Sequence, residues 1–259
     1  MLTDLETKII YGIKDITSHA KETGKLADLH NGLIKFFNDL AEDYDPKQIL
    51  NSTESPALSK KLLEVLNPDR SKKIIKVGKA VEIIGLDKKL LENYSIRHYT
   101  SSDPLDWTEK KVKSNLTLTV EKIFNRRPLL ERRTPSGHTT FKDWCSIGNV
   151  GDTFYCLFYK NEPVTEASFL GSCTHYIEWS LDKFINCWTS IDWLDPTARQ
   201  LQPLSGSILS ILRFYFSNGT ANIESAKGFF KIPKLFFDKY NNFEIKKHGS
   251  FAFSPDQVH

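Results

Sequence analysis

The sequence has no apolar stretch that approaches the roughly 20 residues of a membrane-spanning helix. Its first residues carry acidic side chains, and they lack the basic segment and apolar run of a secretory signal. Polybasic tails, low-complexity segments and repeats of a fixed period are also missing. These absences exclude the membrane, secreted and fibrous classes of protein, so we expect a soluble protein that acts in the cytoplasm.

Cysteines are few, and their spacing does not suit a metal. The four cysteines lie 11, 17 and 14 residues apart, so no pair forms the C-x-x-C spacing of a zinc site. A chain of 259 residues can bury a sizeable core without disulfides or a structural metal. We therefore expect no metal, and reduced, buried thiols at Cys145, Cys156, Cys173 and Cys187.

A strong charge bias is also missing, since 35 Lys and Arg oppose 32 Asp and Glu for a net charge of +3. This balance excludes a strongly basic nucleic-acid binder. The charge is nevertheless uneven, because residues 110–133 hold eight Lys and Arg against two Glu, with Glu109 just before them. Such a segment suits a phosphate-rich ligand or a nucleic acid, but a solvated surface segment explains it at least as well.

Apolar residues at three- and four-residue spacing dominate residues 1–93. Stripes begin at Ile9 and at Leu29, and Pro56 and Pro68 mark loops or helix starts. We expect four or five amphipathic helices there, and we place a boundary between a helical N-terminal region, 1–93, and a second region, 94–259.

Strand-like segments follow residue 94. The alternation of side chains predicts strands at 95–100, 116–120, 152–159, 174–179, 243–246 and 251–253. Helical spacing returns at 204–216. This order of elements predicts an α+β fold with a split, mixed β-sheet rather than a regular α/β alternation.

The first candidate constellation is Arg97-His98-Tyr99-Thr100, at the end of a predicted strand and before a turn. Alternate side chains of a strand point to opposite faces, so Arg97 and Tyr99 share one face, and His98 and Thr100 the other. A strand end of this kind is a good platform for ligand contacts. Composition alone favours the simpler interpretation, in which His98 is a hydrogen-bonded interior histidine.

Two further features gather polar residues. Gly148-Asn149-Val150-Gly151 suits a tight turn with positive φ before a strand, and it lacks the spacing of a glycine-rich phosphate loop. Glu178 and Glu244 each lie within a predicted strand. Period-two alternation does not distinguish the solvent side of a sheet from the wall of a cleft, so both orientations of each glutamate remain open.

Taken in order, these segments resemble the ADP-ribosyltransferase-like toxin superfamily with a histidine-tyrosine-glutamate type of site. The resemblance rests on Arg97-His98-Tyr99-Thr100, on the middle segment from His138 to Phe158, on the 204–216 helix and on the closing Phe243-Glu244-Ile245 strand. It covers residues 94–255 and leaves 1–93 outside. The sequence departs from the family pattern because it has no clean Ser-Thr-Ser or Glu-x-Glu signature.

The resemblance implies roles for individual residues. Glu244 is the expected catalytic carboxylate, and Glu178 is its alternative. His98 is expected to bond the adenine-side ribose, and Thr100 to contact the nicotinamide side. Phe154 or Tyr155 supplies the aromatic wall of the nicotinamide pocket, Tyr99 is structural, and the diphosphate is held by Arg97 or by the arginines of 126–133.

The function implied is an NAD-dependent ADP-ribosyltransferase, a bacterial toxin or effector of toxin–antitoxin type. It would transfer ADP-ribose to a protein or nucleic acid and release nicotinamide, with NAD as substrate and no metal. Its partners would be this macromolecular acceptor and an antitoxin or immunity protein. No association with a membrane is expected. An NAD glycohydrolase, or a non-catalytic protein- or RNA-binding module, is the alternative.

Overall fold

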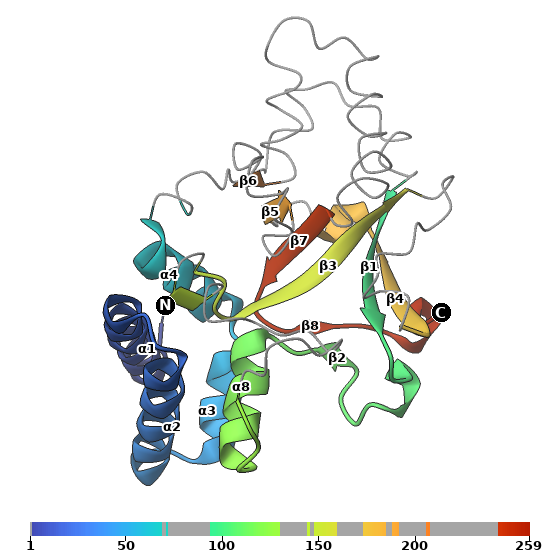
Figure 1. The fold of residues 1–259 in the computed structure, drawn as a ribbon. Coiled ribbons are helices and arrows are strands. Elements are labelled where there is room, and N and C mark those ends of the chain that lie inside the picture. The colour runs from blue at the N-terminus through green and yellow to red at the C-terminus, as the bar shows by residue number, and fades with distance from the viewer. Residues whose placement is uncertain are drawn as a thin grey trace, which may run out of the picture. The chain divides into compact units, whose positions relative to one another are not determined.

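The computed structural model describes residues 2–68, 71, 94–129, 144–145, 148–159, 173–184, 188–191, 206–207 and 243–259. Helices and an antiparallel sheet are both present, so the predicted α+β class is confirmed (Figure 1). The chain forms two compact units from interleaved segments. The first holds 1–71, 111–153 and 248–252, and the second holds 72–110, 154–247 and 253–259. The single division after residue 93 stays a prediction.

Four helices open the first unit: α1 (Asp4–Thr23), α2 (Leu26–Asp43), α3 (Pro46–Thr53) and α4 (Pro56–Leu66). Their ends follow from local chemistry. Thr3 and Glu6 form a capping box at the start of α1, and Gly24 ends it in the left-handed conformation. Asp45 and Ser55 cap the backbone amides of α3 and α4, each before a proline at the first helical turn.

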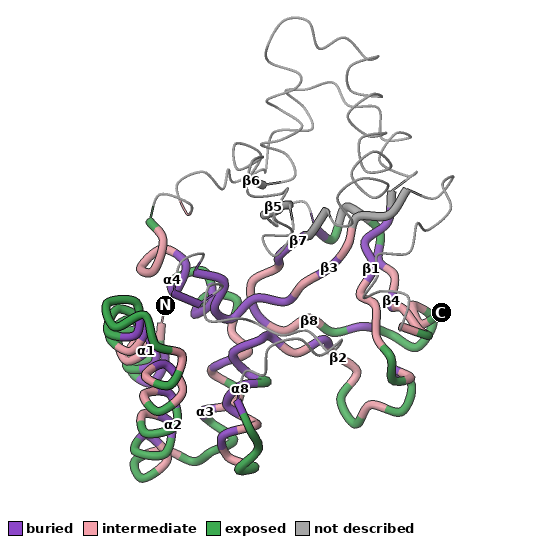
Figure 2. Tube along the Cα trace, viewed as in Figure 1, coloured by how far each residue is buried: buried purple, intermediate pink, exposed green. Residues whose placement is uncertain are grey.

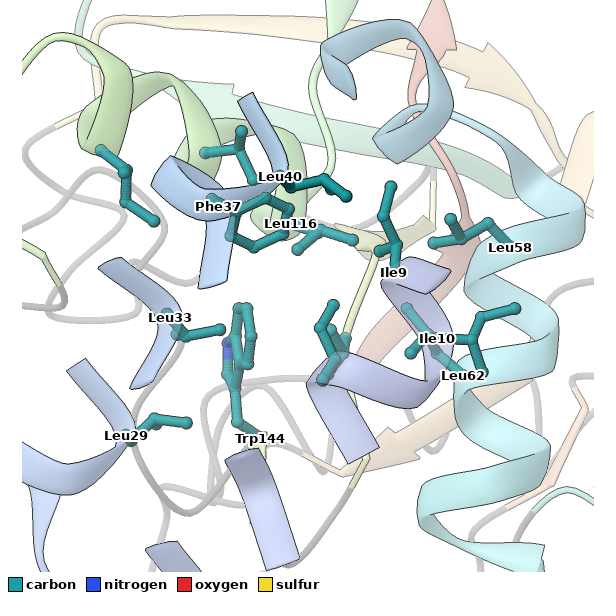
Figure 3. Close-up of a cluster of buried hydrophobic side chains, with 14 of the residues drawn as sticks. Ile9, Ile10, Leu29, Leu33, Phe37, Leu40, Leu58, Leu62, Leu116 and Trp144 are labelled. Carbon is teal, nitrogen blue, oxygen red and sulfur yellow. The ribbon is translucent and has the colours of Figure 1, made fainter. Parts of the chain in front are cut away.

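The apolar stripes of these helices meet in one core, which Figure 3 shows in close-up. Along α2 the buried positions recur on one side of the helix, as the purple segments in Figure 2 indicate. The core also takes in Trp144, whose side chain is fully buried. Its labelled members in Figure 3 include Ile9, Ile10, Leu29, Leu33, Phe37, Leu58, Leu62 and Leu116.

A fifth described helix, α8 (Asn115–Phe124), overlaps the segment for which alternation predicted a strand at 116–120. That prediction was wrong. Ser114 caps the helix by accepting a hydrogen bond from the Thr117 amide. Leu116 and Val120 are buried four residues apart, whereas Leu118 is exposed, which is the period of a helix and not of a strand.

The first unit is completed by two short antiparallel strands, β2 (Lys111–Val112) and β8 (Phe251–Ala252). The strand predicted at 251–253 is therefore present over its first two residues. Lys111 pairs with Ala252, and Val112 with Phe251.

A six-stranded sheet of order β4-β1-β3-β7-β5-β6 belongs to the second unit except at Asp152, Thr153 and His248. Every strand pair with a described register is antiparallel. The strands predicted at 95–100, 152–159, 174–179 and 243–246 are confirmed within one or two residues. The strands are β1 (Tyr94–Thr100), β3 (Asp152–Tyr159), β4 (His175–Ser180), β5 (Trp188–Ile191), β6 (Gly206–Ser207) and β7 (Phe243–His248).

Short 3-10 turns lie at η1 (Pro104–Asp106), η4 (Leu181–Phe184) and η6 (Pro255–Gln257). Within the helix predicted at 204–216, Gly206–Ser207 form strand β6 and are not helical. The remainder of 204–216 lies outside the described residues.

Candidate functional site

The register of the sheet sorts the predicted site residues between its two faces. Arg97 lies opposite Glu178, and Tyr99 lies opposite Tyr176, so these four residues share one face of β1 and β4. Arg97 also lies opposite Cys156 on β3, which puts Phe154, two residues earlier, on the same face. We name this surface the arginine face; its members on the described strands are Arg97, Tyr99, Phe154, Cys156, Tyr176, Glu178 and Lys246.

Arg97 is anchored on the arginine face by an ion pair and by an aromatic ring. Its Nε donates to Glu178 Oε2 over 2.6 Å, and its guanidinium carbon lies 4.0 Å from the centre of the Tyr176 ring. Burial acts to lower the pKa of Arg97, but hydrogen bonds to Tyr99 and Glu178 raise it above its ordinary value overall. The guanidinium is therefore a permanent cation at this position.

Burial and the contact with Arg97 also have opposing effects on the pKa of Tyr99. Burial raises the pKa of its phenol, and the hydrogen bond and charge of Arg97 offset only part of that rise. The hydroxyl therefore keeps its proton at neutral pH. Its ring packs against Tyr176 with the ring centres 5.7 Å apart.

Strand β7 contributes the cation of Lys246 to the arginine face and, by alternation along the strand, the position of Glu244. The ammonium of the buried Lys246 lies 5.7 Å from the centre of the Phe154 ring, so Lys246 belongs to the arginine face. Glu244 stands two residues earlier in the same strand and therefore occupies a position on that face. Its register partner on β5 is Ser190. Sequence reasoning did not single out Ser190, although Trp188-Thr189-Ser190-Ile191 has the composition of a strand.

His98 and Tyr155 lie on the opposite face, in an aromatic cluster with Trp179 and Phe184. The His98 and Tyr155 ring centres are 5.7 Å apart, and those of Tyr155 and Phe184 are 4.7 Å apart. His98 Nδ1 bonds the Phe154 carbonyl oxygen at 2.9 Å. Burial lowers the pKa of His98, and this hydrogen bond offsets the effect in part. These contacts match the simpler interpretation of His98 as a hydrogen-bonded interior histidine.

Thr100 is engaged in the turn that follows β1. Its hydroxyl lies 3.2 Å from both the carbonyl oxygen and the hydroxyl of Ser102, and it accepts a hydrogen bond from the Ser102 amide. Strand parity sets it on the face of His98. The structure thus brings Arg97, Phe154, Glu178 and the position of Glu244 to one face, and it sets His98, Thr100 and Tyr155 on the other.

The turn before β3 is a structural feature. Gly148 and Gly151 have φ values of 78° and 85°, as their residue type permits. Asn115 of α8 holds this turn, because its amide group donates to the Asn149 carbonyl and its oxygen accepts from the Gly151 amide at 2.7 Å. His138, Thr139 and Asp143, which the resemblance also used, lie outside the described residues.

Much of the described part of the basic segment 110–133 is engaged in internal contacts. Lys110 donates to the carbonyls of Leu105 and Trp107 at 2.6 and 2.7 Å. Lys111 pairs with Glu54 at 2.7 Å, and Lys113 pairs with Glu121. These lysines stabilise local structure, which weakens the case for a phosphate-binding surface along this segment. Arg126 and Arg127 are exposed, and Arg132 and Arg133 lie outside the described residues.

The first unit contains a Ser–Asp–His cluster that sequence reasoning did not find. The Ser59 hydroxyl donates to Asp152 Oδ1 at 2.9 Å, and His248 Nδ1 bonds the same oxygen at 2.7 Å. Ser59 Oγ and His248 Nδ1 are 3.1 Å apart. A nucleophilic triad needs its serine and aspartate on different ring nitrogens. Here both contact Nδ1, so the cluster joins three segments of chain rather than forming a triad.

Among the described residues, no group of three or more His, Cys, Asp or Glu side chains is arranged to hold a metal ion. The helices described here are also too short or too polar to cross a membrane. Comparisons with protein-family models, with curated proteins and with solved structures found no match.

Proposed function

We propose that the protein is an NAD-dependent ADP-ribosyltransferase, which moves ADP-ribose from NAD to a macromolecular acceptor and releases nicotinamide. The observation that carries this proposal is the arginine face. A buried guanidinium at Arg97, an aromatic ring at Phe154 and the strand position of Glu244 share one side of a single sheet. The resemblance implies these three kinds of group for an NAD site, as a cation for the diphosphate, an aromatic wall for the nicotinamide and a carboxylate for the ribose.

The reaction breaks the bond between the nicotinamide nitrogen and the ribose carbon, and positive charge develops on the ribose. A carboxylate close to that sugar stabilises the developing charge, as it does in glycoside hydrolysis. In this proposal Glu244 supplies that charge and orients the acceptor nucleophile. Ser190, the register partner of Glu244, is a candidate to support it.

Two other groups bind the substrate. Arg97 carries a permanent charge in a partly buried position, where an ion pair with a diphosphate is weakened little by solvent. Phe154 is half-buried on the same face and presents an apolar ring for the nicotinamide. His98, Thr100 and Tyr155 act from the opposite face by supporting the sheet, so the proposed site uses Phe154 for the aromatic wall.

The proposal extends to the setting of the reaction. Cys145, Cys156 and Cys173 are free thiols, and burial raises the pKa of Cys145 to about 11. Free thiols suit a reducing cytoplasm, where a toxin or effector would meet its acceptor and an antitoxin partner.

The test is release of nicotinamide from NAD, measured by chromatography with and without a bacterial lysate as the source of acceptor. Glu244→Gln keeps the shape of the side chain and removes its charge, so we expect nicotinamide release to fall by about 100-fold or more. Glu22→Gln, at an exposed site on α1, is the matched control and should retain full activity.

The outcomes separate the alternatives. Release of nicotinamide without labelling of any acceptor would identify an NAD glycohydrolase. Full activity of Glu244→Gln would transfer the catalytic role to Glu178. Absence of both NAD binding and nicotinamide release would reject the enzyme and favour a binding module.

A further inference from the structure

Strand β4 holds the Arg97 guanidinium from two directions. The guanidinium carbon lies over the Tyr176 ring, 4.0 Å from its centre, and Glu178 accepts from the Arg97 Nε at 2.6 Å. The Arg97 and Glu178 side chains are 11% and 23% exposed, so solvent screens their attraction less than it screens a surface pair. Glu178 is thus a close internal anion for the cation proposed to bind a diphosphate.

Residues 257–259 hold this strand in place. Backbone hydrogen bonds of 2.9 Å run in both directions between Tyr176 and His259, whose rings also stack. Gln257 donates its side-chain amide to the Glu178 carbonyl at 3.1 Å. These contacts hold the Glu178 backbone beside Arg97, so the ion pair is a built feature of the sheet and not an exposed, freely rotating contact.

We propose that Glu178 is a built-in competitor that regulates the affinity of the arginine face for phosphate-bearing ligands. A carboxylate and a diphosphate oxygen both accept hydrogen bonds from a guanidinium. A diphosphate that binds at Arg97 therefore shares the charge and the donors of the guanidinium with Glu178, and it has to overcome repulsion from the negative charge of Glu178. This inference rests on the proposed function, which assigns the diphosphate of NAD to Arg97.

A competing carboxylate and a catalytic carboxylate at Glu178 predict opposite effects on ligand binding when the charge is removed. If Glu178 competes with the ligand, removal of its charge strengthens diphosphate binding. If Glu178 serves as the reserve catalytic carboxylate or positions Arg97, the same change weakens binding or turnover. Glu178→Gln separates these cases because the amide keeps the size of the side chain and an oxygen that accepts from Arg97.

The experiment measures binding of inorganic pyrophosphate and of NAD to the full chain by calorimetry. We expect Glu178→Gln to bind pyrophosphate about tenfold more tightly than the unmodified protein, with a smaller gain for NAD, whose diphosphate carries less charge. Glu178→Asp draws the carboxylate back from Arg97 and should give an intermediate gain. Glu121→Gln removes the acid of the Lys113 ion pair in the other unit and should leave both affinities unchanged.

Unchanged or weaker pyrophosphate binding by folded Glu178→Gln, with a normal unfolding transition, would overturn the proposal. Arg97→Lys tests the location, because loss of the planar guanidinium should abolish the gain that Glu178→Gln confers. Persistence of that gain in the double variant would also overturn it. Tighter pyrophosphate binding in a protein that never releases nicotinamide would reject the transferase and leave the competition intact.

Discussion

Arg126 adopts a backbone conformation that its residue type disfavours. It follows the end of α8 with a φ of 52°, and among the described non-glycine residues it is alone in having a positive φ. The Arg127 amide closes the helix by donating to the Lys122 carbonyl at 2.8 Å, the pattern of a left-handed helix cap. Glycine is the residue that usually fills this position, since it has no β-carbon to strain.

We predict that Arg126→Gly stabilises the protein by about 0.5–1 kcal/mol, because relief of backbone strain exceeds the entropy that glycine adds to the unfolded chain. Urea unfolding followed by circular dichroism measures the change. Arg127→Gly removes the same charge at a residue without positive φ, and it should bring no gain. Equal stabilisation by both variants would attribute the effect to charge and refute the backbone explanation.

The second residue-scale prediction concerns His98, whose pKa is lowered below its ordinary value of 6.5 by burial. In the interval between the folded-state pKa and about 6.5, the unfolded chain binds more protons at this residue, so stability falls as pH falls. His98→Asn keeps a donor for the Phe154 carbonyl and cannot ionise. The variant should lose less stability between about pH 7 and pH 5 than the unmodified protein does.

Urea unfolding at a series of pH values measures this slope, and NMR titration of the histidine rings assigns it. Burial also lowers the pKa of His30 in the first unit, which therefore contributes in the same direction. His30→Asn shows that share separately. An unchanged slope in His98→Asn, together with an NMR pKa at or above 6.5 for His98, would contradict the prediction.

For single residues, the sequence predicts which side chains of a strand share a face, but it does not predict which of the two faces carries a ligand. Alternation correctly placed Arg97 and Tyr99 on one side of β1, and His98 on the other. Which side carries a ligand depends on register with β3 and β4, whose residues lie more than 50 positions away in the sequence. A strand contains no local signal for that choice, so the residues assigned to one site by resemblance divide between two faces.

Among the elements, α8 shows that a short alternation of apolar residues can predict a strand where a helix forms. Leu116, Leu118 and Val120 alternate with threonines, and β-branched threonine favours strands. In the structure Thr117 and Thr119 are buried, and their hydroxyls are hydrogen-bonded within the helix, to Ser114 and to the Asn115 carbonyl. A tertiary contact adds to these, because the Thr53 hydroxyl donates to that of Thr117 at 3.1 Å. Satisfied hydroxyls cost little to bury. The longer helices α1 and α2 were predictable because their apolar stripes extend over several turns.

The packing of α1 against α2 depends on a glycine. A β-carbon added at Gly12 would lie 2.2 Å from the ring of Phe36 on α2, well inside contact distance. We predict that Gly12→Ala destabilises the protein by about 1–3 kcal/mol, although alanine favours helices more than glycine does. Denaturant unfolding measures the cost.

Phe36→Leu in the Gly12→Ala background provides the control, since a smaller side chain leaves room for the new methyl group. The double variant should recover part of the loss, and the interaction energy in a double-mutant cycle should be about 0.5 kcal/mol or more. Simple additivity of the two changes would show that the glycine is not required by this contact.

For the whole molecule, composition and the order of elements were enough to predict the α+β class. They did not predict that segments 111–153 and 248–252 join the N-terminal helices in one unit. Interleaving of this kind arises from contacts between residues far apart in the chain, which leave no periodic pattern in the sequence. Asp152 is an example, because alternation marked it only as the start of a strand, whereas its carboxylate contacts residues 93 and 96 positions away.

Substitutions in the cluster of Ser59, Asp152 and His248 test whether these distant segments stabilise one another. Asp152 is 1% exposed, and its Oδ1 atom accepts from both partners. Asp152→Asn should destabilise the first unit by about 2 kcal/mol, because the amide can no longer satisfy both donors with a charged acceptor. Ser59→Ala should destabilise it by about 1 kcal/mol.

Since Ser59 and Asp152 share a hydrogen bond, the double variant should lose less stability than the sum of the two single losses, by about 0.5 kcal/mol or more. Urea unfolding of the four proteins measures this coupling, with exposed Ser18→Ala on α1 as the control for loss of a hydroxyl. Additive losses would mean that the serine and the aspartate stabilise the unit independently, and that the cluster does not join its segments.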